Sequence, residues 1–514
     1  MSKTANRVVK NTGYLYAGMA ISLFMSLYTT RLILNALGAS DYGIYGIVGG
    51  AIALLGFLNG SLTVATQRFM SYTQGEKNIQ RQKEIFNNSI VLHGILSIIV
   101  VVVLELAAYP LFQWILTIPA DRIDAAQLIY QFLIVSTVFT ILSVPYDAAI
   151  NAHENMRYYA YVGVFESLLK LIVAIFIYYT SYDKLIAYGF LMTLLSILIL
   201  SIKFAYCKNK YSECTIIGNY YNRQTASQLM TFAGWTFVDT MGTMVGLNGG
   251  EVVMNHYFGP IVNAAGTVSL QLRGRLMAFT NSMLKSLNPV IIKKEGEGNR
   301  EEMLAFTLSG AKMSYLLFAF LAIPFIIDAP FILKLWLGNV PDWAVCFSRI
   351  QMFIGLAYSL SVTLTTSLNA SGIIKKNSIF RCIVHIIPLF LFALLYKYGA
   401  EPYWSYIIVL INYSVVLEGY LLYQCHLHCN LNAIDYLRKI LFPCLICSLF
   451  SFVIGWIVSM LLEESVIRLF FIMLIIDFVL FLSSYIILLD NIERAYLRSS
   501  LVKVIGNMTK RRIL

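Results

Sequence analysis

Charged residues are scarce in this 514-residue chain: they make up 13% of it, whereas 58% of the residues are hydrophobic and the mean hydropathy is +0.71. A soluble globular domain carries about 25% charged residues. The shortage excludes an ordinary soluble protein and indicates a chain that lives in lipid. At about 20 apolar residues per span, there is room for roughly a dozen or more membrane helices.

Cysteines are also few, and the eight present are scattered through mostly apolar segments, which argues against a disulfide framework. The run Cys425-His426-Leu427-His428-Cys429 offers four soft ligands, but they would bind zinc only with strained geometry. We interpret it as a short polar loop. Cys444 and Cys447 lie within an apolar run, where packing is the simpler explanation. We therefore expect no metal and no cofactor.

Large hydrophilic segments are missing as well. The longest loop predicted on the outer side, from Asp328 to Trp343, has about 15 residues. No extramembrane domain is left in which a catalytic site could be built, so we expect a protein that is not an enzyme. The apolar run after Lys10 is too long for a signal-peptide core of about 7–15 residues and contains Arg31, so it predicts a retained first span.

What the sequence does contain is a series of apolar runs, and hydropathy predicts fourteen membrane-spanning helices, an all-α integral membrane fold. Their expected ranges are about 12–37, 42–66, 87–116, 125–149, 158–180, 184–207, 227–249, 257–284, 305–328, 345–369, 378–397, 402–424, 437–462 and 466–489.

Basic residues alternate between the predicted loops. Segments on the side of the N-terminus hold 27 of the 38 Lys and Arg, and the opposite loops hold five. The net charge of +11 therefore reflects positive-inside topology rather than nucleic-acid binding, for which we expect no role. The bias predicts fourteen spans with both termini cytoplasmic.

Glycines recur at a constant offset. Gly13, Gly38 and Gly75 are followed by Gly234, Gly259 and Gly296, each 221 residues later. Such a repeat in a membrane chain predicts two similar six-helix lobes, related by a pseudo-two-fold axis and facing a cavity. We expect an N-lobe at 1–210, a cytoplasmic connector at 211–226, a C-lobe at 227–430, and two further helices with a basic cytoplasmic tail at 431–514.

Charges at bilayer depth are expensive and usually face protein or water. In the eighth predicted helix, Asn263, Thr267, Gln271 and Arg275 recur every four residues and share one face, whereas Arg273 points roughly the opposite way. We favour Arg275 as a cavity-lining residue. The alternative is that the polar residues bond neighbouring helices to one another.

The first and second predicted helices also contain candidate cavity-lining residues, but the sequence supports them less strongly. Arg31 lies in the outer half of the first helix, where it either faces the cavity or extends to the headgroups. Asn59 and Thr63 lead to Arg68 along the second helix, where helix-helix contacts or phospholipid are equally good explanations. Glu166 and Lys170, four residues apart, form a self-neutralised pair.

Acidic residues within spans are candidates for a coupling ion. Asp239 lies in mid-span without a charged neighbour on its own helix, so it is the candidate proton or sodium site. Glu105, Glu418 and Asp477 are weaker candidates, and His385 is more simply a buried imidazole. The summed charge predicts a positive cavity, and because guanidinium groups bind phosphate well, it suits a phosphorylated or pyrophosphorylated amphiphile.

Several motifs resemble those of bacterial polysaccharide flippases of the multidrug, oligosaccharidyl-lipid and polysaccharide exporter superfamily. They are Asn11-Thr12-Gly13-Tyr14-Leu15-Tyr16, the run from Leu34 to Tyr45, Ala65-Thr66-Gln67-Arg68-Phe69, Val144-Pro145-Tyr146-Asp147, and the run from Ala152 to Ala160. The resemblance covers the whole chain and implies twelve core helices in two lobes plus two C-terminal helices.

This resemblance also implies a function. The substrate would be an undecaprenyl-pyrophosphate-linked oligosaccharide, moved across the bacterial inner membrane for O-antigen, lipopolysaccharide or other surface polysaccharide. Membrane lipid, a coupling cation (H⁺ or Na⁺) and polysaccharide polymerase machinery would be partners. Arginines of the first, second and eighth helices line the cavity in related lipid flippases, which implies substrate roles for Arg31, Arg68 and Arg275, beside Gln271, Asn59 and Thr63.

Two alternatives stay open from sequence. One is a cation-coupled multidrug antiporter. That branch uses acidic groups in its N-lobe, and the first helix here has none before Asp41. The other is a membrane enzyme of glycan assembly, which the short outer loops and the absence of paired carboxylates at a loop mouth disfavour.

Overall fold

The computed structural model describes residues 3–53, 55–116, 118–215, 220–491 and 493–495. Within them the regular structure is entirely helical, as predicted. The main helices are α1 (Lys3–Ala53), α2 (Gly56–Glu76), α3 (Ile79–Pro110), α4 (Ile123–Ala152), α5 (Met156–Tyr179), α6 (Lys184–Lys210), α7 (Arg223–Gly296), α8 (Arg300–Leu337), α9 (Ala344–Ala370), α10 (Lys375–Lys397), α11 (Trp404–Ile411), α12 (Glu418–Cys429), α13 (Ala433–Tyr436), α14 (Phe442–Leu461) and α15 (Val466–Ser483).

Short irregular turns of helix connect some of these elements. They are η1 (Leu111–Ile115), η2 (Ala120–Arg122), η3 (Asn412–Leu417), η4 (Leu437–Leu441) and η5 (Ser484–Leu488); η2 is a 3₁₀ turn and the other four are π-helical. Polar side chains fix many helix starts, because they accept hydrogen bonds from the first free backbone N–H groups. The capping residues are Asn78, Asn155, Asp183, Asn222, Asn299, Asn432 and Ser465.

Eleven helices among the described residues are long and apolar enough to cross a membrane, and the bent pair Ser40–Ile52 and Gly56–Glu76 makes a twelfth. The predicted count of fourteen is therefore not confirmed. The difference lies in α7, whose two limbs occupy the predicted seventh and eighth spans. Helix α7 is less apolar than the helices that qualify as spans, with Asp239 in its first limb and Arg273 and Arg275 in its second.

The structure places the recurring glycines in matching roles. Gly38 breaks α1 with φ 76° and ψ 169°, and Gly259 breaks α7 with φ 77° and ψ −177°. Such positive φ angles favour glycine, so each break joins two successive helices by the same device. Matched contacts recur elsewhere: Cys207 Sγ lies 3.7 Å from the Tyr146 carbonyl oxygen, and Cys425 Sγ, 218 residues later, lies 3.7 Å from that of Leu364.

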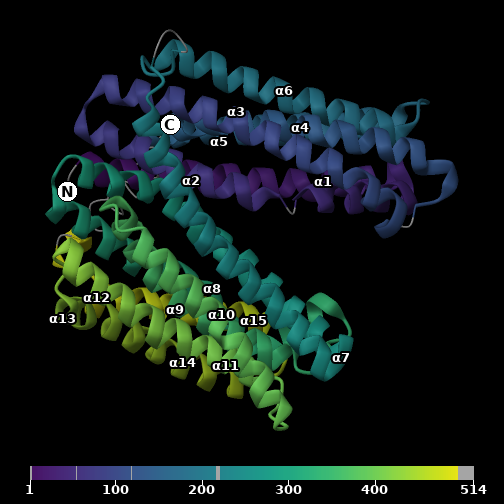
Figure 1. Ribbon diagram of the computed structural model, residues 1–514. Coiled ribbons are helices and arrows are strands. Elements are labelled where there is room, and N and C mark those ends of the chain that lie inside the picture. Colours follow the sequence, from purple (N-terminus) through teal and green to yellow (C-terminus); the bar gives the residue numbers. More distant parts are fainter. Residues whose placement is uncertain (1–2, 54, 117, 216–219, 492, 496–514) are drawn as a thin grey trace, which may run out of the picture.

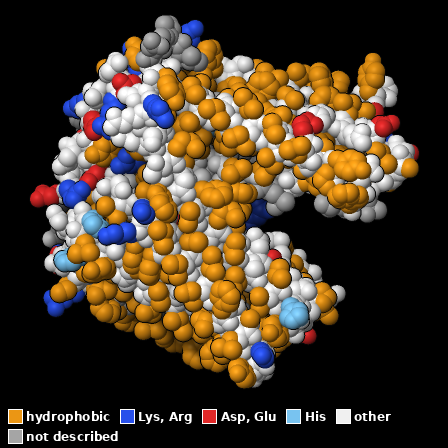
Figure 2. Space-filling view, in the orientation of Figure 1, with side chains coloured by type: hydrophobic (Ala, Val, Ile, Leu, Met, Phe, Trp, Pro, Cys, Tyr) orange, Lys and Arg blue, Asp and Glu red, His pale blue; other side chains and the backbone are white. Residues whose placement is uncertain are grey.

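Figure 1 shows the resulting two bundles, with α1 and α3–α6 in one and α8–α15 in the other. They meet at the side where the N-terminus lies and spread apart on the other side. Figure 2 shows that the gap is a real notch in the molecular surface. We call the end with the N-terminus the closed end and the other the open end. Predicted lobe boundaries at 210 and 227 remain predictions, and residues 216–219 of the connector and 496–514 of the tail lie outside the described residues.

Helices α14 and α15 pack on α8 and so belong with the C-terminal bundle. Tyr315 of α8 pairs its hydroxyl with Ser448 of α14 at 2.8 Å. Arg468 of α15 forms an ion pair with buried Asp328 of α8. Near the closed end, the Lys312 ammonium lies 3.1 Å from Glu493. Polar bonds at both ends of the helices therefore add to the apolar contact between them.

Candidate functional site

The two bundles are joined at the closed end by a tight helix crossing. A Cβ atom added to Gly75 of α2 would lie 2.1 Å from the Lys293 carbonyl oxygen of α7, and one added to Gly296 would lie 2.1 Å from that of Tyr72. Tyr72 and Lys293 are themselves 221 residues apart, so the crossing lies on the pseudo-two-fold axis. Both positions need glycine because the backbones themselves touch there.

A second seam runs between α1 and the second limb of α7. Thr12 and Ser286 pair their hydroxyls at 2.7 Å, the Tyr16 hydroxyl donates to the Phe279 carbonyl at 3.1 Å, and the Ser282 hydroxyl lies 3.3 Å from Met19 Sδ. On α7 these contacts follow a single helical stripe at 279, 282 and 286. Extended by one turn towards the open end, the same stripe reaches Arg275, which is exposed. Arg275 thus continues the seam into the gap between the bundles.

The matching stripe of α1 continues into a cavity of about 640 Å³ on the N-terminal side of the gap. Met19, Ser26 and Thr30 line it from α1, and Tyr188 lines it from α6. Its one lysine, Lys170, lies 2.6 Å from Glu166, which confirms the predicted self-neutralised pair. The cavity therefore offers hydroxyl groups, aromatic rings and thioethers with little net charge.

A cavity of about 410 Å³ in the C-terminal bundle has a different character. Asp239 of α7 accepts a hydrogen bond of 3.0 Å from the Arg381 guanidinium of α10, and Arg381 also donates to Thr365 at 2.9 Å. Arg273 and His385 line the same space. No described residue forms a hydrogen bond or ion pair with the Arg273 guanidinium. With two arginines and one carboxylate, the cavity is positive.

Arg273 also borders a smaller cavity of about 80 Å³, lined in part by Glu251 and Gln351. Arg273 therefore lies on the side of α7 opposite Arg275, and it borders cavities within its own bundle that helical periodicity did not predict. Helix α7 thus faces the interlobe gap on one side and an internal cavity of its own bundle on the other. Arg381 lies inside the span predicted at 378–397, and that position was the one signal in the sequence that could have identified it.

The remaining predicted site residues are not brought together. Arg31 is exposed and does not line the cavity that contains its neighbour Thr30. Gln271 is exposed on the Arg275 side of α7. On α2, Thr63 donates to the Asn59 carbonyl at 2.7 Å, and the Asn59 amide oxygen is buried without a described partner. Their roles in substrate binding stay predictions.

Arg68 connects the bundles at the closed end. Its guanidinium donates to the carbonyl groups of Asn369 at 3.2 Å and Ala370 at 2.8 Å, where α9 ends. It also lies 4.6 Å from the ring centroids of both Phe69 and Tyr72. In this conformation two of the guanidinium nitrogens donate across the lobes, and the predicted role in substrate binding stays a prediction.

Charged groups reinforce this closure. Glu154, buried at the turn between α4 and α5, pairs with Arg7 at 2.7 Å and lies 3.6 Å from the Lys293 ammonium of the other bundle. Lys285 of α7 reaches the N-terminal bundle, where its ammonium lies 3.5 Å from the centroid of the Tyr159 ring. Cations of α7 thus contact the N-terminal bundle at two separate points.

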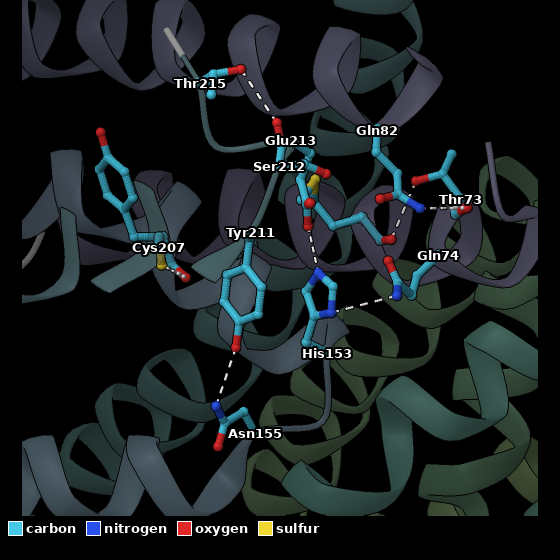
Figure 3. Close-up of polar contacts among 12 residues, drawn as sticks. Thr73, Gln74, Gln82, His153, Asn155, Cys207, Tyr211, Ser212, Glu213 and Thr215 are labelled. Carbon is cyan, nitrogen blue, oxygen red and sulfur yellow. Dashed lines mark hydrogen bonds and ion pairs between the residues drawn. The ribbon is translucent and has the colours of Figure 1, made fainter. Parts of the chain in front are cut away.

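The turn that carries Glu154 is held in place by polar contacts with the segment that follows α6, which Figure 3 shows. His153 Nε2 lies 2.5 Å from a Glu213 carboxylate oxygen, and the imidazole stacks on the Tyr211 ring at 4.0 Å. Asn155 donates to the Tyr211 hydroxyl at 3.2 Å. These bonds tie the segment after α6 to the turn between α4 and α5, in which Glu154 has a positive φ of 55°. They therefore hold in place the Glu154 carboxylate that faces Lys293.

The cysteine and histidine run at 425–429 does not converge on one point. Cys425 faces the Leu364 carbonyl inside the bundle, whereas His426 Nδ1 lies 2.9 Å from the Leu431 carbonyl oxygen. Across the described part of the chain, no three His, Cys, Asp or Glu side chains gather as metal ligands would.

Comparison with known proteins identifies the fold. The MatE family model matches residues 16–176, and no curated protein matches the chain in sequence. An outward-facing multidrug resistance MATE family transporter of the MOP superfamily is 14% identical, with a TM-score of 0.72 over 84% of this chain and 96% of that chain. A MATE structure in the bent conformation has a TM-score of 0.73 at 14% identity, with the same coverage.

A third similar structure is a MOP superfamily transporter from Pyrococcus furiosus, whose binding pocket of reverse polarity is said to suggest a different function. It is 13% identical, with a TM-score of 0.69 over 85% of this chain and 97% of that chain. The chain thus has the fold of MATE transporters. None of these comparisons supports the more specific expectation of a polysaccharide flippase.

Proposed function

We propose that this protein is a membrane exporter that works by alternating access, with the two bundles rocking about the crossing of α2 and α7. The closed end would face the cytoplasm, as the distribution of basic residues predicts, and the open end would face outward. The single observation that carries the proposal is the asymmetry of the gap. It is sealed at one end by matched contacts of a two-fold repeat and is open at the other.

The seal is built from contacts that can break as a set. The interlobe hydrogen bonds and ion pairs include Thr12 to Ser286, Arg68 to the end of α9, and Glu154 to Lys293. Beside them, α2 and the first limb of α7 share a buried apolar cluster that contains Phe69 and Phe232. Polar contacts that separate together, next to an apolar crossing that can act as the pivot, suit rigid-body rocking of the two bundles. The two internal cavities would then face alternate sides of the membrane in turn.

The relatives favour cation-coupled efflux of amphiphilic compounds, because the similar structures include multidrug transporters. Asp239 is the coupling group predicted from sequence, but its bond to Arg381 means that a cation would have to compete with a guanidinium, which leaves that role open to another carboxyl group. Transport across the bacterial inner membrane, with both termini cytoplasmic, is part of the same proposal.

The charge of the C-terminal cavity bears on the substrate. Asp239 is already paired, whereas Arg273 has no anionic partner among the described residues. An organic cation would meet an unfavourable field there, and an anionic or zwitterionic amphiphile a favourable one. The same charge supports a second candidate, a pyrophosphate-linked lipid oligosaccharide, even though the comparisons do not favour it.

Reconstituted vesicles would test the proposal. With an imposed proton or sodium gradient, we expect the protein to move an anionic fluorescent amphiphile several-fold faster than a cationic one. Arg273→Gln should raise the half-saturating concentration of the anionic probe about tenfold, the effect of losing one charge-assisted hydrogen bond. Lys439→Gln, which removes an exposed cation far from both cavities, is the matched control.

Two outcomes would redirect the proposal. Faster transport of the cationic probe, with no effect of Arg273→Gln, would contradict the anionic substrate. Transfer of a lipid-linked oligosaccharide, without movement of either dye, would favour the second candidate. Absence of any transport in vesicles that contain folded protein would contradict the exporter itself.

A further inference from the structure

Glu418 is a buried carboxyl group that the proposed transport cycle does not yet use. It lies at the start of α12, directly after the π-helical turn η3, and its relative exposure is 4%. Three other carboxylates inside helices have a basic partner: Asp147 pairs with Lys203, Asp239 with Arg381, and Asp328 with Arg468. Among the described residues, Glu418 has no such partner.

Its hydrogen bonds can be counted. Glu418 Oε1 lies 2.7 Å from the Tyr436 hydroxyl oxygen, and the same hydroxyl lies 3.2 Å from the Leu360 carbonyl oxygen of α9. The hydroxyl has one proton and two acceptors facing it. If Glu418 is ionised, Tyr436 can satisfy the carboxylate but not the carbonyl. If Glu418 is protonated, its O–H donates to Tyr436, which in turn donates to Leu360.

The surroundings also favour the protonated form. Glu418 Oε2 is buried and has no hydrogen-bond partner among the described residues. The titratable groups next to the pair are the thiols of Cys425 and Cys444, which supply no positive charge. An unpaired carboxylate in such a site lacks both solvation and a counter-charge, and a group so placed takes up a proton instead.

The position of the pair connects it with the transport cavity. Tyr436 bonds to α9 at Leu360, and one turn earlier the same helix lines the C-terminal cavity through Gly355 and Tyr358. The π-helical turn before Glu418 carries Tyr413, which lines that cavity as well. Helices that reshape the cavity during transport therefore also set the Glu418 environment, and π-helical turns are frequent at such functional positions.

We propose that Glu418 is a proton-binding site that is occupied in this conformation, with Tyr436 and the Leu360 carbonyl as its hydrogen-bond relay. Resting on the proposed function, the proton on Glu418 is the coupling ion: it is bound while the outer end is open and released when α9 and α12 shift in the opposite state. Such a site stores the proton as a neutral acid, so that no unpaired negative charge is buried beside α9 and α12.

Infrared difference spectroscopy on the purified full chain tests the binding site without any transport. We expect a protonated-carboxyl C=O stretching band that shifts in D₂O and disappears in Glu418→Gln. Glu463→Gln, at an exposed carboxyl in the loop between α14 and α15, should retain it. If Glu418→Gln does not fold, Tyr436→Phe serves in its place, and it should move the band to higher frequency by removing the hydrogen bond. A band that neither variant alters would overturn the assignment.

Vesicle assays then test coupling. We expect Glu418→Gln to retain exchange of substrate across the membrane but to lose at least tenfold in accumulation driven by a proton gradient. Glu463→Gln should keep both. Full gradient-driven accumulation in Glu418→Gln would overturn the coupling role while leaving the infrared result valid. If no substrate moves even in the unmodified protein, the proposed function fails, and the infrared band still decides whether Glu418 binds a proton.

Discussion

At the residue scale, the two arginines of the C-terminal cavity are held in opposite ways. The Arg381 guanidinium is bound by Asp239 and Thr365, so its position is fixed. The Arg273 guanidinium has neither a carboxylate nor a hydroxyl partner among the described residues, and it faces two cavities. A fixed arginine sets the local field, whereas an unpartnered one is available to a ligand.

The Asp239 and Arg381 pair gives a stability prediction. Their side chains are 22% and 12% exposed, so solvent screens them little. Arg381→Met should lower the free energy of unfolding by about 3 kcal/mol, because it leaves a largely buried carboxylate unpaired. The double variant with Asp239→Leu should recover most of that loss. Unfolding in SDS measures both; equal losses in the single and double variants would contradict the pairing argument.

At the scale of elements, the breaks in α1 and α7 decide how each bundle begins. Gly38 and Gly259 have nearly the same backbone angles and open space where a Cβ atom would lie. An alanine there meets no neighbour but must adopt a left-handed conformation. The two breaks therefore depend on backbone freedom and not on packing.

We expect Gly38→Ala and Gly259→Ala each to lower the free energy of unfolding by about 1–2 kcal/mol because of the positive φ. The matched control is Gly234→Ala, in a helical stretch with equally open space, which should stabilise the protein by up to about 1 kcal/mol. SDS unfolding again provides the measurement. A loss in Gly234→Ala as large as in the other two would refute the conformational explanation.

The loops at the open end of the N-terminal bundle are tied by one arginine. Arg122 pairs with Asp41 at 2.5 Å and with Asp183 at 2.7 Å. Burial by itself raises the pKa of the Asp183 carboxyl, but hydrogen bonds from Arg122 and from the start of α6 outweigh it and lower that pKa below its ordinary value. The ionised form of Asp183 therefore stabilises the folded state.

Because the folded pKa is the lower one, this stabilisation is complete above the unfolded value of about 3.9 and is lost as the pH falls through the folded value. Thermal unfolding of wild type and Asp183→Asn, measured between about pH 3 and pH 7, should show a difference that is largest at pH 7 and shrinks below about pH 4. A difference that does not change with pH would mean that the carboxylate charge has no part in it.

At the scale of the whole molecule, closure of one end is the property on which transport depends. Thr12 and Ser286 lie across the seam with their hydroxyl oxygens 2.7 Å apart. A disulfide formed in the double variant Thr12→Cys, Ser286→Cys should lock the closed end, and reduction should release it. We expect oxidation to abolish transport in vesicles and reduction to restore it to at least half of the unmodified rate.

The chain offers a matched control for this experiment. Thr307 and Ser367 pair their hydroxyls at 2.6 Å inside the C-terminal bundle, so a disulfide between cysteines at these positions crosses no seam. Its oxidation should leave transport unchanged, as should oxidation of the eight native cysteines in the unmodified chain. Full transport with the seam disulfide formed would show that the bundles do not move apart there.

The all-helical membrane fold was predictable from sequence because hydropathy and loop charge are local properties that the bilayer imposes directly. The two-lobed repeat was predictable from glycine spacing, since Gly38 and Gly75 have backbone requirements that no other residue meets. The predicted count of fourteen spans was not confirmed at α7. The two limbs of this helix border cavities and are too polar to be recognised as membrane spans by hydropathy.

The candidate site was less predictable. Sequence periodicity places Arg275 on a polar face, and the structure shows that this face extends the interlobe seam. The same periodicity places Arg273 on the opposite side of α7, but it predicts neither the internal cavity there nor the approach of Arg381 to Asp239, because packing between distant helices is not encoded in local spacing. Arg68 shows the reverse case: a plausible substrate residue is bound to carbonyl groups some 300 positions away.

Composition and local backbone constraints are enough to establish a helical membrane protein that repeats its first hairpin, because each of these properties arises within a few turns of the chain. Which charges are paired, which face a cavity and which hold the bundles together became known only from the packed helices. Those outcomes depend on contacts between helices that are far apart in the chain, and the energy of a buried charge is set by the neighbour it meets there.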